Sequence, residues 1–271
     1  MKKSLLICLL CTLFLTACAT PEATEPATEV TAPPVETTAA PTEVTIAPTE
    51  QTTIPTEPPV TEPEHSALYI PGADVEDVII WFNEVVLSAE FVNSGNPSFV
   101  QKWDSPIRYM IHGTPTAEDL TTLENFTQWL NCIEGFPGIY ETTDPFEVNL
   151  NIHFCSQEEL IQQLGDNFYG TDGGVTFWYT GDNRIYDAII CIRTDLNQYL
   201  RNSVILEELY NGLGPVQDTS LREDSLIYAG YSEPQDLTEI DKLILRLLYH
   251  PEMKCGMNSA QCEDVIRRVY Y

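Results

Sequence analysis

Two adjacent glutamates, Glu207 and Glu208, begin the stretch of the chain whose residue types are best suited to chemistry. Asn211, Gln217 and Asp218 follow, so carboxylate and amide oxygens recur at helical spacing and again just after it. A positioned carboxylate can act as a general base, and Glu208 is the candidate for that role. We therefore take these five residues as a candidate groove.

Zinc is a poor match for these donors. One carboxylate and two neutral amides supply neither the imidazole nor the thiolate groups of a tight zinc site, and an amide oxygen binds zinc weakly. Calcium remains an alternative, because Glu223 and Asp224 add oxygen donors nearby. Histidines on other predicted elements are expected to be packed or surface residues, and these are His112, His153 and His250. The sequence therefore predicts no metal and no cofactor.

The same stretch resembles the active-site helix of zinc peptidases, H-E-x-x-H-x-x-G-x-x-H-D. Glu208, Gly214 and Asp218 match that pattern. The three histidine positions are instead occupied by Glu207, Asn211 and Gln217. The resemblance implies a zincin-like scaffold from which the metal ligands have been lost.

Motifs between residues 103 and 257 resemble a bacterial domain family of unknown function, the one numbered 2927. Members typically read H-E-E-L-x-Q-x-L-G-L-x-N-D at 206–218, where this chain has Leu206 in place of the histidine. The resemblance implies a zincin-like α+β fold and no settled activity. The other motifs that carry it are Trp103-x-x-Pro106-Ile107-Arg108, Ser225, Leu237-Thr238-x-x-Asp241 and Gly256-Met257.

Two classes of function fit this pattern. The first is a non-catalytic binding domain on a degenerate metallopeptidase-like scaffold, because the three ligand positions are vacant in an otherwise preserved motif. The second is a peptidase-like hydrolase in which Glu208 is the general base and Glu207 and Asp218 hold a metal or a proton. A purely structural alternative places one glutamate in water and uses Asp218 to cap a turn. We expect binding rather than catalysis.

A predicted hairpin, Val175–Tyr179 with Ile185–Arg193, carries further aromatic residues. In zincins the strand beside the active-site helix is a sheet edge on which an extended peptide adds as a strand. If the hairpin supplies that edge, Trp178 or Tyr179 would stack on a sugar or on a peptide side chain. The competing interpretation is a core strand, because the odd-numbered residues from 175 to 179 are all apolar.

The flanking elements predict an α+β fold, with a small mixed sheet, flanking helices and a helical C-terminal half. Strands are expected at Ile107–Ile111 and Val148–Cys155, in addition to the hairpin. Helices are expected at 75–92, from Thr116 to Gly135, at Gln157–Leu164, 195–213, 238–249 and 259–270.

Five cysteines fall in this globular part. Cys155 and Cys191 lie in strand-like runs and are expected to be small buried apolar residues. Cys255 and Cys262 are close enough in sequence to form a disulfide, which an oxidising compartment would permit. No C-x-x-C pair supports a zinc ribbon or a thioredoxin-type site.

The N-terminus predicts export and a lipid anchor. A basic start at Lys2-Lys3 precedes a short apolar run, too short to span a membrane, and residues 1–17 therefore read as a signal peptide. The sequence Leu15-Thr16-Ala17-Cys18 resembles the lipobox of bacterial lipoproteins. In that resemblance Cys18 becomes the N-terminus and carries the lipid that anchors the protein on the extracytoplasmic face of the membrane.

Residues 18–65 predict a disordered tether before a single globular domain at 66–271. Proline, threonine and glutamate dominate the segment, glutamate recurs every seven residues from Glu22 to Glu64, and the segment contains no lysine or arginine. The whole chain has a formal net charge of -28, which disfavours nucleic acid as a partner. The expected partners are the membrane, through Cys18, and either a cell-wall component or an extended peptide.

Overall fold

The computed structural model of the chain describes residues 66–87, 99–230 and 232–271. These residues fall within one compact unit. The predicted signal peptide, the lipid-bearing Cys18 and the tether lie outside them. Within the described part, no helix combines the length and apolar character needed to cross a membrane.

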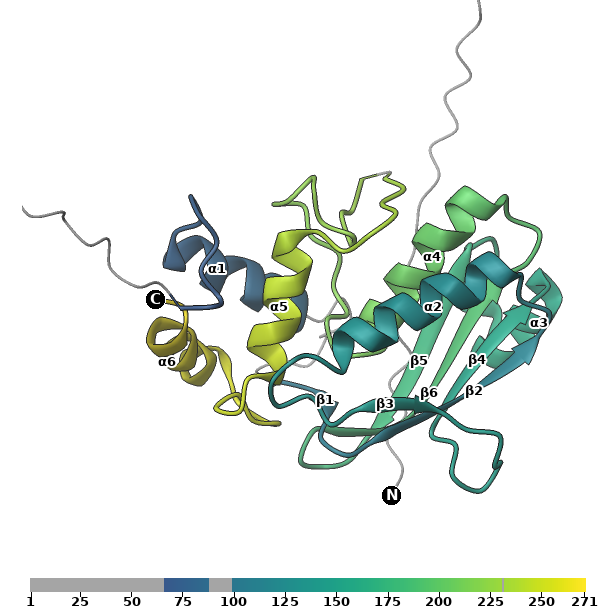
Figure 1. Cartoon of the computed structure of the whole chain (residues 1–271), viewed down its shortest axis with the longest axis horizontal. Helices are drawn as coiled ribbons and strands as arrows, with labels where there is room; N and C mark the ends of the chain where they lie inside the picture. Colours follow the sequence, from purple (N-terminus) through teal and green to yellow (C-terminus); the bar gives the residue numbers. More distant parts are fainter. Residues whose placement is uncertain (1–65, 88–98, 231) are drawn as a thin grey trace, which may run out of the picture. The chain divides into compact units, whose positions relative to one another are not determined.

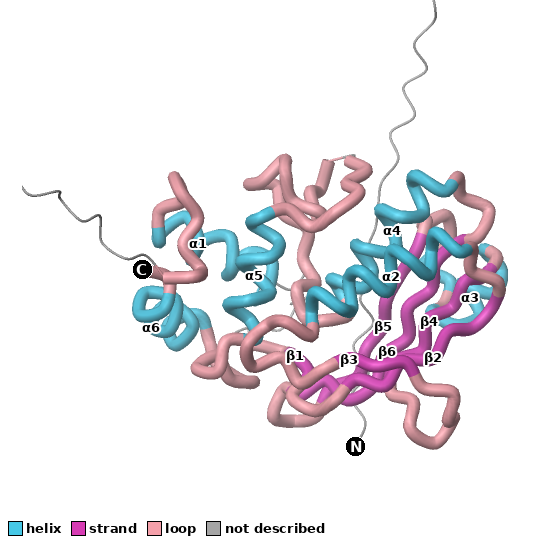
Figure 2. The backbone as a smooth tube through the Cα atoms, viewed as in Figure 1, coloured by secondary structure: helices cyan, strands magenta, loops and turns pink. Residues whose placement is uncertain are grey.

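A six-stranded mixed sheet forms the centre of the domain, in the order β1-β6-β4-β2-β3, with β5 paired to β6 (Figures 1 and 2). Every strand pair is parallel except β5 with β6, which is antiparallel. The strands are β1 Lys102–Trp103, β2 Ile107–Gly113, β3 Ile139–Glu141, β4 Leu150–Cys155, β5 Gly173–Tyr179 and β6 Arg184–Arg193.

Helices cover the two faces of this sheet unequally. Two long helices, α2 (Ala117–Leu130) and α4 (Gln198–Asn211), lie over one face (Figure 1). The short α3 (Gln157–Leu164) and the 3-10 turn η2 (Asp166–Phe168) pack at one end of the other face, because a Cβ on Gly174 would meet side chains from both. Much of that second face, which we call the outer face, is therefore left without a helix.

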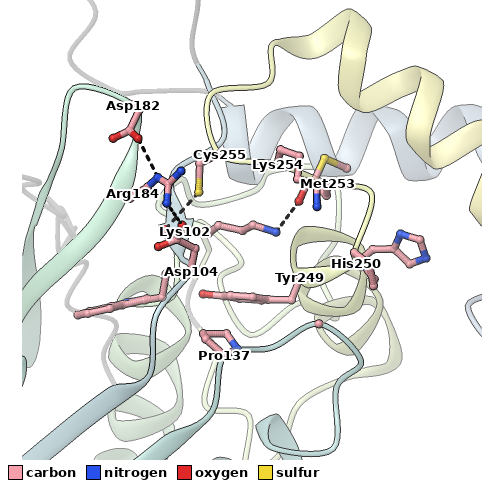
Figure 3. Close-up of a pocket in the computed structure, with 13 residues that line it drawn as sticks. Lys102, Asp104, Pro137, Asp182, Arg184, Tyr249, His250, Met253, Lys254 and Cys255 are labelled. Atoms are coloured by element: carbon pink, nitrogen blue, oxygen red, sulfur yellow. Dashed lines mark hydrogen bonds and ion pairs between the residues drawn. The ribbon is translucent and has the colours of Figure 1, made fainter.

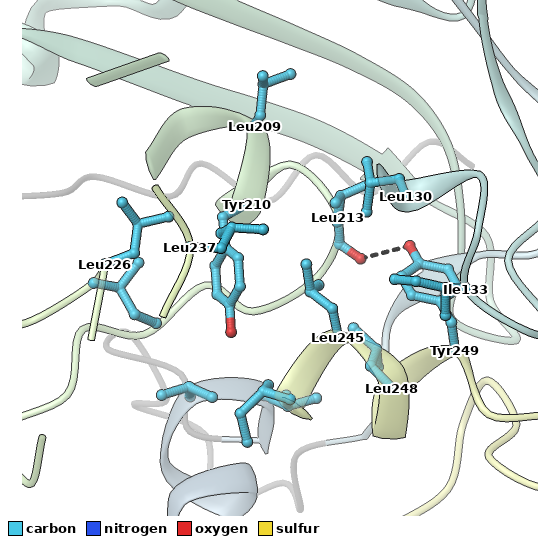
Figure 4. Close-up of a cluster of buried hydrophobic side chains, with 14 of the residues drawn as sticks. Leu130, Ile133, Leu209, Tyr210, Leu213, Leu226, Leu237, Leu245, Leu248 and Tyr249 are labelled. Carbon is cyan, nitrogen blue, oxygen red and sulfur yellow. Dashed lines mark hydrogen bonds between the residues drawn. The ribbon is translucent and has the colours of Figure 1, made fainter. Parts of the chain in front are cut away.

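The C-terminal part is helical and packs beyond the sheet. Its helices are α5 (Glu239–Tyr249) and α6 (Ser259–Val269), and α1 (Val75–Phe82) joins them from the start of the domain. Leucines of α5 pack against the end of α4, and the Tyr249 hydroxyl donates to the Leu213 carbonyl at 2.8 Å (Figure 4). The sheet layer and this helical part consequently share one hydrophobic core.

The predicted α+β class and mixed sheet are confirmed. The hairpin is present as β5 and β6, and α3 has the predicted bounds. The helix expected at 75–92 differs: α1 ends at Phe82 and continues as a π-helix, η1, over Asn83–Leu87, while residues 88–92 lie outside the described part. The helix expected at 195–213 is shorter, because Asn197 caps α4 by accepting from the Leu200 N–H.

Candidate functional site

Helix α4 carries three of the five candidate residues, and a buried ion pair fixes its first turns. Arg201 Nε donates to Asp119 Oδ1 at 2.8 Å, and both side chains are almost fully buried. Asp119 also completes the capping box of α2 with Thr116. Burial opposes the charge on Asp119, but hydrogen bonds from Arg201 and Thr116 outweigh it and lower the pKa of this carboxyl. The pair therefore joins α4 to α2 above the sheet.

Glu208 is enclosed between α4 and the sheet. Its residue is only 3 % exposed, and a Cβ placed on Gly173 of β5 would lie 2.9 Å from Glu208 Oε1 and 2.6 Å from Val204 Cγ1. Burial raises the pKa of Glu208 well above its ordinary value, and the charges of Glu207 and Asp218 raise it further. Burial and the neighbouring carboxyls therefore both oppose a charge on Glu208, and strand β5 lies directly against it.

Glu207 shares this environment with two aspartates. Burial raises the pKa of Glu207 to about 8, and the charges of Asp218 and Asp172 act in the same direction. Asp172 immediately precedes β5, and burial raises its pKa as well. Together with Glu208, these residues make a carboxyl cluster, in which Asp172 is a member that the sequence did not predict. The signal that could have identified it is its position next to the two glycines that begin β5.

Asn211 belongs to the same face of α4 and Gln217 turns away from it. Asn211 is 3 % exposed, and its Oδ1 atom has no hydrogen bond from the described residues. Gln217 Nε2 donates to the carbonyl oxygen of Asp218 at 3.4 Å, so its amide is used by the local backbone. Glu207, Glu208 and Asp218 thus lie close enough for their charges to act on one another. Glu208 and Asn211 are buried, whereas Glu207 and Asp218 are partly exposed.

Within the described ranges, no group of three or more His, Cys, Asp or Glu side chains is placed to hold a metal ion. The two acids offered as calcium ligands are exposed, and Asp224 is paired with Arg222. His112 and His153 stack on each other on the outer face of the sheet. This is the face opposite α4, so neither histidine lies near the carboxyl cluster.

Hydrogen bonds to Asp241, Glu84 and Val85 hold the loop that carries Asp218. Asp241 accepts hydrogen bonds from the Ser225 hydroxyl at 2.7 Å and from the Leu226 N–H at 3.0 Å. Glu84 of the π-helix accepts from Thr219, and the Val85 carbonyl accepts from the N–H groups of residues 216 and 217. Ser225 and Asp241, two of the residues that carry the family resemblance, thus bind each other beside this loop.

The edge of β5 does not offer the binding surface expected of it. Among the described strands β5 pairs only with β6, as a peptide-accepting edge would. However, Gly173 to Phe177 are all buried, with Phe177 at 0 % exposure. The core-strand interpretation is therefore correct for these residues, and only Trp178 and Tyr179 are half-exposed.

The outer face instead presents a polar and aromatic surface. Side chains alternate between faces along a strand, and outside the end that α3 covers, the alternate residues of β2, β4 and β6 that point away from α2 and α4 are half-buried. His112 Nε2 and Asn151 Oδ1 are 2.8 Å apart, and the Arg108 guanidinium lies over the Tyr140 ring at 5.1 Å. The residues of this face are Arg108, Met110, His112, Asn151, His153, Trp178, Asp187 and Ile189.

All five cysteines of the domain are free thiols. The disulfide considered between Cys255 and Cys262 is absent, because the Cys255 thiol donates to the Lys102 carbonyl at 3.6 Å while Cys262 is buried in the core at the start of α6. Cys155 and Cys191 are buried beneath α3, as expected for small apolar residues.

The fold is thus an α+β domain with a mostly parallel sheet and one antiparallel strand, β5, beside the helix that bears Glu207 and Glu208. The sequence profile of the family described as "Protein of unknown function (DUF2927)" matches residues 76–268, and the chain belongs to this family. A search of curated proteins finds no significant match.

Proposed function

We propose that the protein is an extracytoplasmic lipoprotein, anchored by a lipid on Cys18, whose domain binds a cell-wall glycan without catalysing a reaction. The lipobox-like sequence and the preceding apolar run support the anchor. The tether of residues 18–65 would then hold the domain away from the bilayer. A fully extended proline-rich chain rises about 3.1 Å per residue, so a tether of this length would reach on the order of 145 Å at full extension.

The outer face of the sheet is the surface to which we expect the glycan to bind. A sheet face that packs in a core is apolar, whereas this one places an indole, two imidazoles, an amide and a carboxylate on adjacent strands. Trp178 lies opposite Asp187 on neighbouring strands, and Asn151 lies between Met110 and Ile189. Flat aromatic surface with planar hydrogen-bonding groups is suited to a sugar, whose rings have apolar faces and hydroxylated edges.

The burial of β5 favours a glycan over an extended peptide as the ligand. Strand addition requires free N–H and C=O groups along an exposed edge. Gly173 to Phe177 are buried, so no such edge is open beside α4. The peptides of the cell wall are the alternative ligand, and the experiment below tests binding to them separately.

The degenerate metallopeptidase-like scaffold remains part of the proposal. Support comes from the position of α4 against β5, which pairs only with β6 among the described strands, since the zincin resemblance implies an edge strand beside the active-site helix. A general base must reach the proton that it removes. Glu208 is 3 % exposed beneath β5 and cannot do so in this conformation, which supports binding over hydrolysis.

A hydrolase that uses Glu208 is the second candidate, and one observation favours it. The pKa of Glu207 is raised to about 8, and carboxyl groups with strongly raised pKa values cluster at functional sites. In this alternative the cluster opens to substrate and exchanges a proton between its members. Metal-independent hydrolysis of a peptide or wall fragment that is lost in Glu208→Gln would establish it.

The test uses purified wall material in two forms. Glycan strands freed of peptides and isolated stem peptides are titrated separately into the full-length protein in detergent. The proposal predicts saturable binding of the glycan strands, weakened roughly tenfold or more by Trp178→Ala. Binding of the peptides alone, or no binding of either, contradicts it.

A further inference from the structure

A cavity lies on the side of the domain formed by β1, the β5–β6 turn and the chain that follows α5 (Figure 3). Its volume is ≈ 530 Å³, within the usual range for sites that bind small molecules. No member of the carboxyl cluster lines it. The residues that matter for its chemistry are Lys102, Asp104, Pro137, Arg184, Tyr249 and Lys254.

Lys102 is a buried cation in the wall of this cavity. The residue is 7 % exposed, and Nζ donates to the carbonyls of Leu248 at 2.7 Å and Met253 at 2.6 Å. These bonds explain part of its role, because Leu248 lies in the last turn of α5, where a cation is favourable. An ammonium has three donors, so one N–H remains after both carbonyls are satisfied.

The charges around the cavity do not balance at Lys102. Arg184 is neutralised by Asp104 at 2.5 Å and Asp182 at 2.8 Å. Neither Lys102 nor Lys254 has an ion-pair partner among the described residues, whereas most other arginines and lysines there do. Burial lowers the pKa of Lys102 to about 8, and the charge of Lys254 acts in the same direction. Buried charges are normally paired, whereas the negative charge of Asp104 acts on Lys102 only from beyond ion-pair distance and Asp104 itself is paired with Arg184.

We propose that this cavity binds a small organic monocarboxylate, with its carboxylate between Lys102 and Lys254. The third N–H of Lys102 and the exposed ammonium of Lys254 supply charge-assisted hydrogen bonds. The apolar part of the ligand packs against Pro137 and the Tyr249 ring, which lies 5.4 Å below Lys102 Nζ (Figure 3). Asp104 and Asp182 at the rim disfavour a dianion, so a carboxylate is preferred over phosphate.

This site is separate from the proposed glycan surface, so the carboxylate proposal does not depend on the result of the glycan experiment. Calorimetric titration of the full-length protein in detergent compares benzoate, benzamide and inorganic phosphate. Benzamide has the shape of benzoate without its charge, and phosphate tests whether any anion suffices. The expected result is saturable binding of benzoate, with at least tenfold weaker binding of the other two.

Two lysine variants locate the site. Lys102→Met and Lys254→Met should each weaken benzoate binding at least tenfold, while the control Lys242→Met, an exposed lysine paired with Glu239 on α5, should not. Lys254 is exposed, so its variant remains informative if Lys102→Met fails to fold. The proposal is overturned if benzoate does not bind, if benzamide or phosphate binds as well, or if Lys254→Met binds benzoate like the wild type.

Discussion

Gly173 of strand β5 and Glu208 of helix α4 touch so closely that a Cβ on the glycine would lie 2.9 Å from the glutamate Oε1. The glycine therefore lets the strand lie directly on the helix and closes the carboxyl cluster from one side. The same Cβ would also lie 2.6 Å from Val204 Cγ1, so movement of Glu208 alone would not make room for it.

Gly173→Ala should destabilise the domain by about 1–3 kcal/mol, because overpacking a buried contact displaces side chains or backbone. Chemical denaturation measures the effect. Gly181→Ala is the matched control, since a Cβ there meets nothing within 4 Å in the turn between β5 and β6. Equal stability of the two variants would show that Gly173 of β5 is not closely packed against α4.

The carboxyl cluster should make stability depend on pH. The folded-state pKa of Glu207 is raised to about 8 from an ordinary 4.5, so the folded state binds more protons between these values. Its stabilising contribution is therefore complete below about pH 4.5 and is lost as the pH rises through about 8. Glu208, whose pKa is raised in the same direction, adds to this loss.

Glu207→Gln and Glu208→Gln should each flatten this dependence and raise the melting temperature above pH 8 relative to the wild type. Each pKa unit is worth about 1.4 kcal/mol, so the gain is on the order of a few kcal/mol. Thermal unfolding from pH 5 to pH 9 checks it. A wild-type stability that increases over this range would refute the burial of these carboxyls.

The Arg201–Asp119 pair should be a major support of the helical layer. Arg201→Met leaves a buried aspartate without its cation and should cost about 3–5 kcal/mol. Arg268→Met breaks a half-exposed pair with Glu252 and should cost at most about 1 kcal/mol. Urea unfolding compares them, and similar losses in the two variants would mean that α4 is held by other contacts.

The lipid anchor makes a separate prediction about Cys18. In the bacterial host, Cys18→Ala should abolish incorporation of labelled palmitate and release the protein from the membrane fraction. Cys8→Ala and Cys11→Ala are controls, because both residues would be removed with the signal peptide. Continued labelling of Cys18→Ala would exclude this cysteine as the attachment site.

Local signals predicted the elements well and their arrangement only partly. The bounds of α3 follow from its capping box at Ser156 and Glu159, and those of α5 from Thr238 and Asp241. The order of the parallel strands depends on pairing between distant segments, as between Asn151 and Ile189, which no local pattern encodes. The π-helical turn after Phe82 has no such pattern either.

The candidate site was also predicted only in part, because some of its contacts join segments that are distant in sequence. The spacing of Glu207, Glu208 and Asn211 placed them on one helix, which the structure confirms. The enclosure of Glu208 depends on Gly173, and the raised pKa of Glu207 depends in part on Asp172. Both residues are distant from α4 in sequence, so no local pattern reveals these contacts. The lysine that precedes Trp103 gave no signal of its own, because its burial arises from the chain that follows α5.

We propose that the outer face of the sheet binds glycan and that Glu208 performs no chemistry. Titration of peptide-free glycan strands into wild type, Trp178→Ala and Glu208→Gln tests it most directly, with product analysis of the same mixtures. We expect wild type and Glu208→Gln to bind alike, Trp178→Ala to bind roughly tenfold more weakly, and no strand to be cleaved. Cleavage that disappears in Glu208→Gln, with binding unchanged in Trp178→Ala, would contradict the account.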